Sequence, residues 1–342
     1  MSAYLNTRVS LFSGRLWPAE DLAALIQTPA DDMAQTLADH GLPQLAAGFD
    51  DQDNRSLEQR IISQVLDDTT ILIRPLTGAQ RDFLIYWTER FEVSNVKTLL
   101  RGKMTGERPI AVLNRLTPMG AFGRLDVQDL AHAEDVSELL RRLEAGPYSG
   151  IARQARRAFE ESHDPFILDA ALDRGYYEGL ARRAQTLETS SGASFRRLIG
   201  PLIDRINLVW LLRYRFNYNL PPAQVYFLLV SSHYSLPSSR LRELAALGSL
   251  EAVLEALPES LRNQIQGANT IPCVFARMER AAAENAGKVL HSGAPAIARA
   301  FAYLLLRERD LRSVRSVLRG RLLGLPTDDI RLATYQSCEG TT

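Results

Sequence analysis

Three segments of the chain place apolar residues three and four positions apart, with polar residues between them. The segments SNVKTLLRGK, INLVWLLRYR and RSVRSVLRGR begin at residues 94, 206 and 312 and align without a gap. Their matching apolar residues are Val96, Leu99 and Leu100, then Leu208, Leu211 and Leu212, then Val314, Val317 and Leu318. This spacing puts the three residues of each segment on one face of an α-helix. We therefore expect three equivalent helices, called the signature helices below, each with its apolar stripe buried.

Polar residues also recur at matching positions of the signature helices. When Asn95, Asn207 and Ser313 are aligned, an acid lies three residues before each of them and an arginine six residues after. The acids are Glu92, Asp204 and Asp310, and the arginines are Arg101, Arg213 and Arg319. The helical period places the acids and the asparagines beside the stripe and the arginines well away from it. The arginines have two interpretations. They are surface residues retained from a duplicated ancestor, or they reach acidic groups on a neighbouring helix or line a shared inner surface.

The segments that flank the signature helices repeat as well, at separations of 112 residues (95 to 207) and 106 residues (207 to 313). GRLWPAEDLAALIQ, GRLDVQDLAHAEDV and YSLPSSRLRELAAL begin at residues 14, 123 and 234. This period is much longer than the roughly 20 to 50 residues of solenoid repeats, so each unit is expected to be a small domain. We predict an all-α protein of three homologous helical-bundle domains, with boundaries at 1–108, 109–222 and 223–342.

Proline and glycine mark the predicted ends of several helices. Pro18 and Pro237 each begin a leucine-rich segment, where proline suits the first helical turn. LPPA at 220–223 and GLPTDD at 324–329 predict breaks directly after two signature helices. The best candidate for a β-strand is DTTILIRPL at 68–76, and TLETSSGAS at 186–194 is predicted to be a flexible loop.

The composition narrows the possible function classes. The chain has 40 acidic and 40 basic residues among 342, so it lacks the basic excess of a nucleic-acid-binding protein, and we expect no nucleic-acid partner. Its start, MSAYLNTRVSLF, lacks the features of a signal peptide. No run approaches the roughly 18 apolar residues of a membrane-spanning helix, so any membrane contact is expected to be peripheral.

No segment carries a convincing catalytic, cofactor or metal motif. The five histidines stand far apart, and none has a second histidine at helical spacing or a cysteine beside it. RGKMTG at 101–106 lacks the first glycine of a phosphate-binding loop and has Met104 where Ser or Thr would bind magnesium. DDQDNRS at 50–56 has Arg55 at a ligand position of a calcium loop and no closing glutamate. We therefore predict a protein with no catalytic, cofactor-binding or metal-binding residues.

The repeated segments together resemble a known family. They are E-x-x-N-V-K-x-L-L-R at 92–101, D-x-x-N-L-x-x-L-L-R at 204–213 and E-x-D-L-R-S-V-R-S-V-L-R-G-R-L-x-G-L-P at 308–326, with Tyr4-Leu5-Asn6 and Arg8 near the start. This combination is similar to the C-subunit family of prokaryotic V-type ATPases/ATP synthases, whose eukaryotic counterpart is the d subunit. The resemblance runs over the whole chain and includes the triple repeat.

The resemblance implies a non-catalytic rotor subunit without a cofactor. Members of this family are three-domain, all-helical funnels with pseudo-threefold symmetry. They lie on the cytoplasmic side of the cell membrane, peripheral to it, against the proteolipid ring, and their open end receives the foot of the central stalk. The chain would then transmit torque between the central stalk subunits and the ring, which transports protons or sodium ions.

Two other classes of function predict different observations. A helical scaffold or adaptor protein would show the same repeats but would not copurify with a proteolipid ring and stalk subunits. A helical enzyme with its site at a domain junction would require a cluster of polar side chains with shifted pKa values in a cleft.

Overall fold

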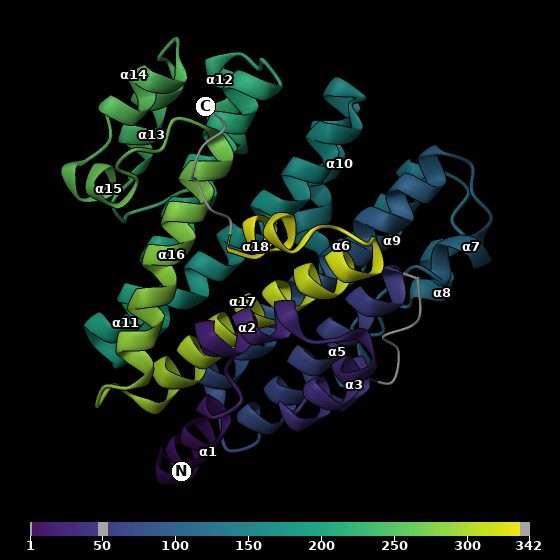
Figure 1. Cartoon of the computed structure of the whole chain (residues 1–342). Helices are drawn as coiled ribbons and strands as arrows, with labels where there is room; N and C mark the ends of the chain where they lie inside the picture. Colours follow the sequence, from purple (N-terminus) through teal and green to yellow (C-terminus); the bar gives the residue numbers. More distant parts are fainter. Residues whose placement is uncertain (1, 47–53, 336–342) are drawn as a thin grey trace.

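The computed structural model of the protein describes residues 2–46 and 54–335, and every regular element in these two ranges is a helix (Figure 1). The all-α prediction is therefore confirmed. The elements are α1 (Ser2–Ser13), α2 (Ala19–Gln27), α3 (Ala30–Asp39), α4 (Pro43–Ala46), α5 (Asn54–Ile73), α6 (Gly78–Met104), α7 (Pro109–Leu113), η1 (Gly120–Phe122), α8 (Val127–Ala131), α9 (Val136–Glu144), α10 (Ser149–Ser162), α11 (Pro165–Leu212), η2 (Arg213–Asn217), α12 (Pro222–Leu228), α13 (Ser238–Ala245), α14 (Leu250–Glu255), α15 (Glu259–Gln264), α16 (Ile271–Leu290), α17 (Ala296–Leu322) and α18 (Thr327–Tyr335).

The strand predicted at 68–76 is wrong, because α5 continues through this segment to Ile73. Residues Val65, Thr69, Leu72 and Leu76 are buried at helical spacing, so the apolar pattern suits a helix once its upstream part is included. The threonine hydroxyls also fit a helix: Thr69 Oγ1 donates a hydrogen bond to the carbonyl oxygen of Val65 at 2.7 Å.

The loop predicted at 186–194 is also wrong, because α11 runs through it with a single break at Gly192. Gly192 has φ 63° and ψ −154°, a backbone conformation that only glycine adopts easily. Leu187 and Phe195, on the two sides of the break, are both buried in the core. These two apolar side chains fix a segment that is otherwise polar.

The signature helices are α6, the C-terminal part of α11, and α17. Their stripe residues are buried as predicted, with 1% of Leu99, 0% of Leu211 and 0% of Val317 exposed to solvent. α7 and α18 each follow a signature helix after a short turn. α7 packs against Gly102, where a Cβ atom would lie only 2.4 Å from the Val112 side chain. α18 packs against Gly320, where a Cβ atom would lie only 2.6 Å from the Ile330 side chain. Glycine at these two positions therefore allows the following helix to approach closely.

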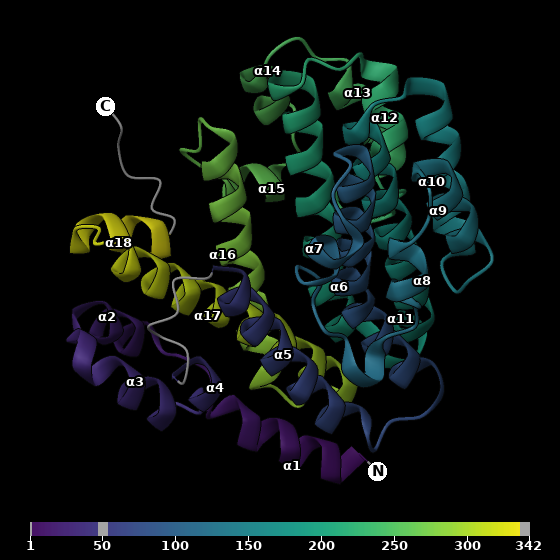
Figure 2. The same cartoon turned by 90° about the vertical axis from the view of Figure 1, so that its right-hand side faces the viewer.

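The three signature helices meet at one point. Phe83, Phe195 and Phe301 stand at the same offset before Asn95, Asn207 and Ser313, and all three are completely buried. The ring centroids are 5.0 Å apart for Phe83 and Phe195, 5.0 Å for Phe83 and Phe301, and 5.7 Å for Phe195 and Phe301. Beyond this contact the helices diverge, so that α18 and α12 lie on opposite sides of the molecule in Figure 2.

The N-terminal helices α2–α4 pack on the last signature helix, α17. Leu25, Met33 and Leu37 belong to one apolar cluster with Val314 and Val317. Figure 2 shows α2 and α3 beside α17 and α18. Residues from the two ends of the sequence thus build one core, while the domain boundaries at 108 and 222 remain predictions. No helix within the described ranges is both long enough and apolar enough to cross a membrane.

Candidate functional site: an arginine-lined cleft beside α17

The repeated acids of the signature helices are buried and accept hydrogen bonds from backbone N–H groups of a loop. Glu92 Oε1 accepts from Arg124 N at 2.7 Å and from Leu125 N at 2.9 Å. Asp204 accepts from Ser235 N at 3.1 Å and Leu236 N at 3.0 Å. Asp310 Oδ2 accepts from Trp17 N at 2.9 Å. Each acid therefore anchors the backbone just before a small helix, which is α8, α13 or α2.

Burial raises the pKa of two of these acids. The pKa of Asp204 lies above its ordinary value because burial disfavours the charged form, while the backbone N–H groups of Leu236 and Ser235 partly offset the effect. The same cause raises the pKa of Asp310 to about 6, with the Trp17 N–H group and Arg309 acting in the opposite direction.

The repeated asparagines bind a second point of the same loops. Asn95 Nδ2 donates to the Thr117 carbonyl at 2.8 Å, and Asn95 Oδ1 accepts from Thr117 N at 2.8 Å. Asn207 makes the same pair of bonds with Val230, at 3.0 and 2.8 Å. Beside both α6 and α11, a segment of the chain runs from the residue that the asparagine binds to the residues that the acid of the same helix binds.

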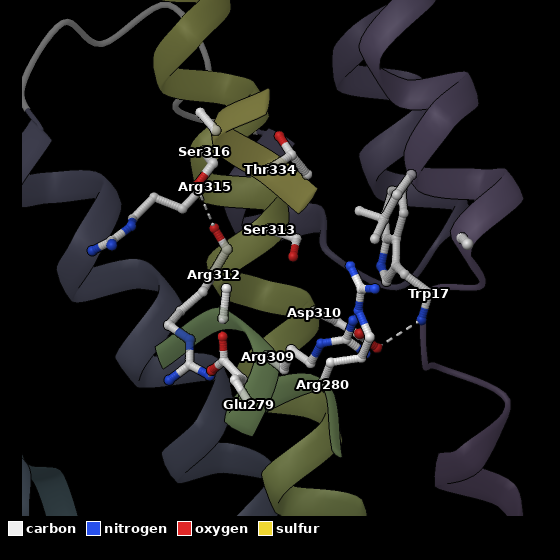
Figure 3. A pocket seen from close by; sticks show the side chains of 14 residues that line it. Trp17, Glu279, Arg280, Arg309, Asp310, Arg312, Ser313, Arg315, Ser316 and Thr334 are labelled. Carbon is white, nitrogen blue, oxygen red and sulfur yellow. Dashed lines mark hydrogen bonds and ion pairs between the residues drawn. The ribbon is translucent and has the colours of Figure 1, made fainter. Parts of the chain in front are cut away.

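The third signature helix, α17, differs at this place. Ser313 replaces the asparagine, and within the described ranges its side chain makes no hydrogen bond with a backbone group. A cleft of about 270 Å³ lies beside α17 at this position (Figure 3). It is lined by Ser313, by Asp310 and Trp17 at the acid, and by Thr334 near the end of α18.

Four arginines surround this cleft, here called the α17 cleft. Arg312 forms an ion pair with Glu279, and Arg315 forms one with Glu58. Arg280 and Arg309 are exposed, and no carboxylate of the described residues lies within ion-pair distance of either. Four arginines and two acids, Glu279 and Asp310, thus line the α17 cleft, so basic groups outnumber acidic groups on its wall.

Trp17 lines the α17 cleft. Its indole Nε1 is buried and finds no hydrogen-bond acceptor within the ranges that the structure describes. The ring stacks on His40 with 4.4 Å between ring centroids. A buried N–H group without a partner is costly.

A smaller cavity of about 60 Å³ continues the α17 cleft toward the other signature helices. It shares Glu279, Arg309 and Arg312 with the α17 cleft and is lined by Trp87 of α6 and Arg205 of α11. Arg205 lies 3.6 Å from Glu279, and burial lowers its pKa below the ordinary value. Side chains from all three signature helices thus face this charged inner surface.

The repeated arginines of the sequence lie elsewhere. Arg101, Arg213 and Arg319 are exposed, and none of them lines the α17 cleft. Arg101 does form an ion pair with Asp169 of α11, a contact that the second interpretation predicted for these residues. The sequence alone did not single out the arginines of the α17 cleft as candidate site residues. Their signal was present, because Arg309, Arg312 and Arg315 recur every third residue and so form a basic row along one helix.

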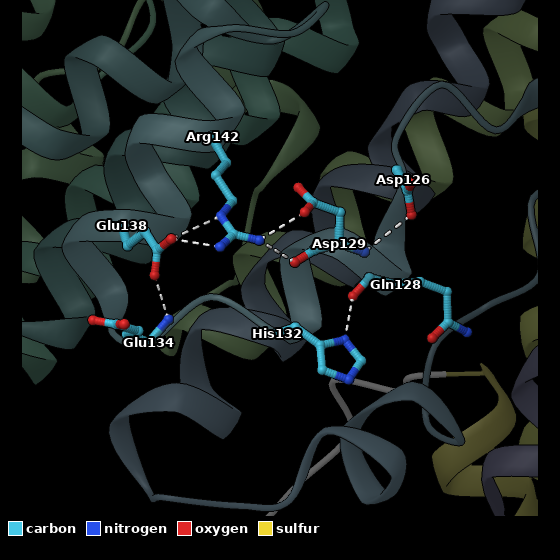
Figure 4. A network of polar contacts seen from close by, with 7 residues as sticks. All are labelled: Asp126, Gln128, Asp129, His132, Glu134, Glu138 and Arg142. Carbon is cyan, nitrogen blue, oxygen red and sulfur yellow. Dashed lines mark hydrogen bonds and ion pairs between the residues drawn. The ribbon is translucent and has the colours of Figure 1, made fainter.

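A polar network around α8 and α9 also involves repeated segments (Figure 4). Asp126 Oδ1 accepts from Asp129 N at 3.0 Å, which caps α8. Arg142 joins the two helices, because it contacts Glu138 and lies 2.7 Å from Asp129 Oδ1. His132 Nδ1 contacts the carbonyl oxygen of Gln128 at 2.7 Å. These contacts cap and connect short helices, so we assign them a structural role.

No group of three or more His, Cys, Asp and Glu side chains within residues 2–46 and 54–335 is arranged to hold a metal ion. The guanidinium groups of the α17 cleft suit carboxylate or other oxyanion partners.

Comparison with known proteins matches the chain to one family. The family model of the ATP synthase (C/AC39) subunit matches residues 5–332. The C subunit of the A-type ATP synthase of Methanocaldococcus jannaschii is 22% identical over 96% of this chain and 85% of its own length. The proteins of the same name from Haloquadratum walsbyi and Archaeoglobus fulgidus are 25% and 22% identical, over 96% of this chain and 96% and 94% of their own lengths.

Proposed function

Because the chain belongs to the ATP synthase (C/AC39) subunit family, we propose that it couples the central stalk of a rotary ATP synthase or ATPase to the proteolipid ring of the membrane sector. The chain is a non-catalytic subunit of such a complex. In this role it transmits torque, and it takes no part in the chemistry of the nucleotide.

The observation that supports this proposal best is the contact of Phe83, Phe195 and Phe301. Three equivalent residues of three equivalent helices meet around one point, which favours a body with pseudo-threefold symmetry and one closed end. Such a body offers two different ends to two different partners. Apolar side chains packed at the density of a protein interior also resist deformation, as a component that carries torque must.

The charged surface formed by the α17 cleft and its extension favours a partner that enters where the three signature helices diverge, here called the open end. Side chains from α6, α11 and α17 line the α17 cleft and its extension, and the surface is polar and positively charged. We assign the open end to the foot of the central stalk and the end near the phenylalanine contact to the proteolipid ring. The chain would then lie on the cytoplasmic side of the membrane, held there through the ring.

The test is to reconstitute the complex in membranes with and without this chain and to measure ATP hydrolysis and ion transport in parallel. Without the chain, the catalytic head should still hydrolyse ATP, because hydrolysis needs only the head. Ion transport should disappear, because torque no longer reaches the ring.

Undiminished ion transport without the chain would contradict the coupling role. Copurification from native membranes provides the control, since a scaffold protein outside the rotary complex would be recovered without proteolipid and stalk subunits. ATP hydrolysis by the isolated chain would favour an enzyme instead.

A further inference from the structure

A hollow of about 610 Å³ lies at the end of the molecule where the signature helices α6 and α17 begin. Its wall comes from α1, from the turn before α6, from α11 just before its break, and from the start of α17. Ala79 of this wall stands four residues before Phe83, and Ile297 stands four residues before Phe301. Four residues make about one helical turn, so the hollow lies one turn beyond the phenylalanine contact. It is therefore at the end near this contact, here called the closed end.

This closed-end hollow differs in chemistry from the α17 cleft and its extension. Those two are lined by arginine and glutamate side chains, whereas none of the described residues that line the closed-end hollow is charged. Small exposed residues such as Ala79, Thr186 and Pro295 form its mouth. Its floor is apolar and buried, and consists of Leu5, Leu76, Leu187 and Ile297. In a chain of which 23% is charged, such a wall suits a hydrocarbon group rather than an ion.

Positive charge lies close to the mouth of the closed-end hollow. Arg74 directly precedes the turn that lines the hollow, is exposed, and has no ion-pair partner in the part of the chain that the structure describes. Arg299 Nη1 donates to Asn6 Oδ1 at 2.7 Å, which places a second guanidinium group between α17 and α1. The first 19 residues of the chain include two arginines and no acid.

The acids near the closed-end hollow do not balance this charge. Asp82 of α6 is exposed, and Glu188 of α11 accepts a hydrogen bond from the Tyr234 hydroxyl. Neither of them lines the hollow. A positive rim around an uncharged hollow suits a molecule with an apolar chain and an anionic head.

We propose that the closed-end hollow binds a hydrocarbon chain of an anionic membrane lipid, and that Arg74 binds the oxyanion of the lipid headgroup. Burial of the chain removes apolar surface from water, and a guanidinium group forms strong hydrogen bonds with phosphate or carboxylate oxygens. The assignment rests on the coupling proposal in one respect, because that proposal turns the closed end toward the membrane sector. It adds a direct lipid contact to the contact with the proteolipid ring.

The test measures binding of cis-parinaric acid, a fatty acid whose fluorescence rises in apolar surroundings, to the full chain at concentrations where the free acid does not aggregate. Ala79→Trp should weaken binding by about tenfold or more, because the indole ring fills the mouth of the hollow without changing its charge. Saturated fatty acids of increasing length then compete with the probe. Each added methylene should strengthen binding by up to about fourfold until the hollow is full, and the affinity should then level off.

Ala111→Trp is the matched control for the filled hollow, because Ala111 is an exposed residue of the short helix α7 and does not line the hollow. It should bind the probe as the unmodified chain does. Arg74→Gln should weaken binding of a fatty acid but not of the alcohol with the same chain, which has no charge. Arg153→Gln, at an exposed position of α10, should change neither. All four positions are exposed, so folding should be retained, and circular dichroism checks this.

Vesicles distinguish a membrane lipid from a free fatty acid. The full chain should float with vesicles of phosphatidylcholine and phosphatidylglycerol more than with vesicles of phosphatidylcholine alone, and Ala79→Trp should reduce the bound fraction. Binding of cis-parinaric acid without binding to either kind of vesicle would assign the hollow to a soluble fatty acid and contradict the proposal.

Four further results would overturn it. Equal loss of binding in Ala79→Trp and Ala111→Trp, or affinity that rises with chain length without levelling off, would mean non-specific adsorption. Tighter binding by a chain that begins at Ser2 would mean that the chain itself fills the hollow. Displacement of the probe by a peptide from a proteolipid loop, at lower concentration than by lipid, would assign the hollow to the ring. Ion transport is measured independently of lipid binding, so this proposal and the coupling proposal can fail separately.

Discussion

Each of the three repeated acids holds a backbone segment in place, but the number of hydrogen-bond donors around the carboxylate differs. Glu92 accepts from two backbone N–H groups and from the Tyr148 hydroxyl, which is 2.6 Å from Oε2. Asp204 accepts from two backbone N–H groups and Asp310 from the single N–H group of Trp17. Donors stabilise the ionised form of a buried carboxylate. Burial outweighs the donors at both Asp204 and Asp310, and at Asp310, which has a single donor, the pKa rises to about 6.

This rise predicts how the stability of the protein depends on pH. Between about pH 4 and about pH 6, folded Asp310 keeps a proton that the unfolded chain has lost, so its contribution to stability is present below this window and is lost as the pH rises through it. A shift from 3.8 to about 6 corresponds to about 3 kcal/mol in the free energy of unfolding. Asp310→Asn should remove this part of the pH dependence. Urea unfolding of both proteins across the window measures it, and parallel curves would contradict the prediction.

At the scale of single elements, the asparagine of a signature helix fixes the loop that follows the next short helix. Asn207 satisfies both backbone groups of Val230, and Val230 is completely buried. A buried N–H or C=O group without a partner costs about 1 to 3 kcal/mol. The two hydrogen bonds of Asn207 are therefore worth more than those of an exposed side chain, and they connect α11 to the segment before α13.

Asn207→Ala should lower the free energy of unfolding by about 2 to 4 kcal/mol, because it leaves both groups of Val230 without a partner. Ser313→Ala is the matched control at the equivalent position of α17, and it should change stability by less than about 0.5 kcal/mol. Urea unfolding gives both values, and hydrogen exchange at the Val230 amide reports the local effect. Similar small losses in both variants would show that the loop does not depend on the asparagine.

The sequence was sufficient for the signature helices but not for the segments around them. The stripe of Leu99, Leu211 and Val317 was predicted correctly because one helical period decides which face is buried. The segment at 68–76 was misassigned because its β-branched residues also occur in helices, where the Thr69 hydroxyl bonds the preceding turn. The break at Gly192 lies inside one helix because buried side chains on both sides of it fix the backbone. Tertiary packing decided both cases, and local sequence does not contain it.

At the scale of the whole molecule, the three phenylalanines stand at repeated positions of the sequence, but their contact with one another could not be predicted from it. Phe83, Phe195 and Phe301 obey the same offsets as the signature helices, yet an aromatic residue at a repeated position has no partner until the helices are placed in space. The α17 cleft could be predicted even less, because it is formed by residues from distant parts of the chain, such as Trp17, Glu279 and Asp310.

Phe301→Ala should lower the free energy of unfolding by about 3 to 5 kcal/mol, because a large, completely buried side chain leaves a cavity. The loss should be at the high end of this range, since the ring contacts Phe83, Trp87 and Phe195 at centroid distances of 5.0, 5.1 and 5.7 Å. Phe227→Ala is the control, because 67% of Phe227 is exposed, and it should cost less than about 0.5 kcal/mol. Thermal or urea unfolding followed by circular dichroism compares the two, and equal losses would contradict the central role of the contact.

Because α2–α4 pack on α17, this packing can form only after α17 has been synthesised. Trp17 and Asp310 are 293 positions apart, so at roughly 5 to 20 residues per second Asp310 is added about 15 to 60 seconds after Trp17. Until then Leu25, Met33 and Leu37 have no α17 to pack against and expose apolar surface on the growing chain. Helices α2–α4 are thus synthesised long before they reach their final packing, and a chaperone that shields them would act during translation.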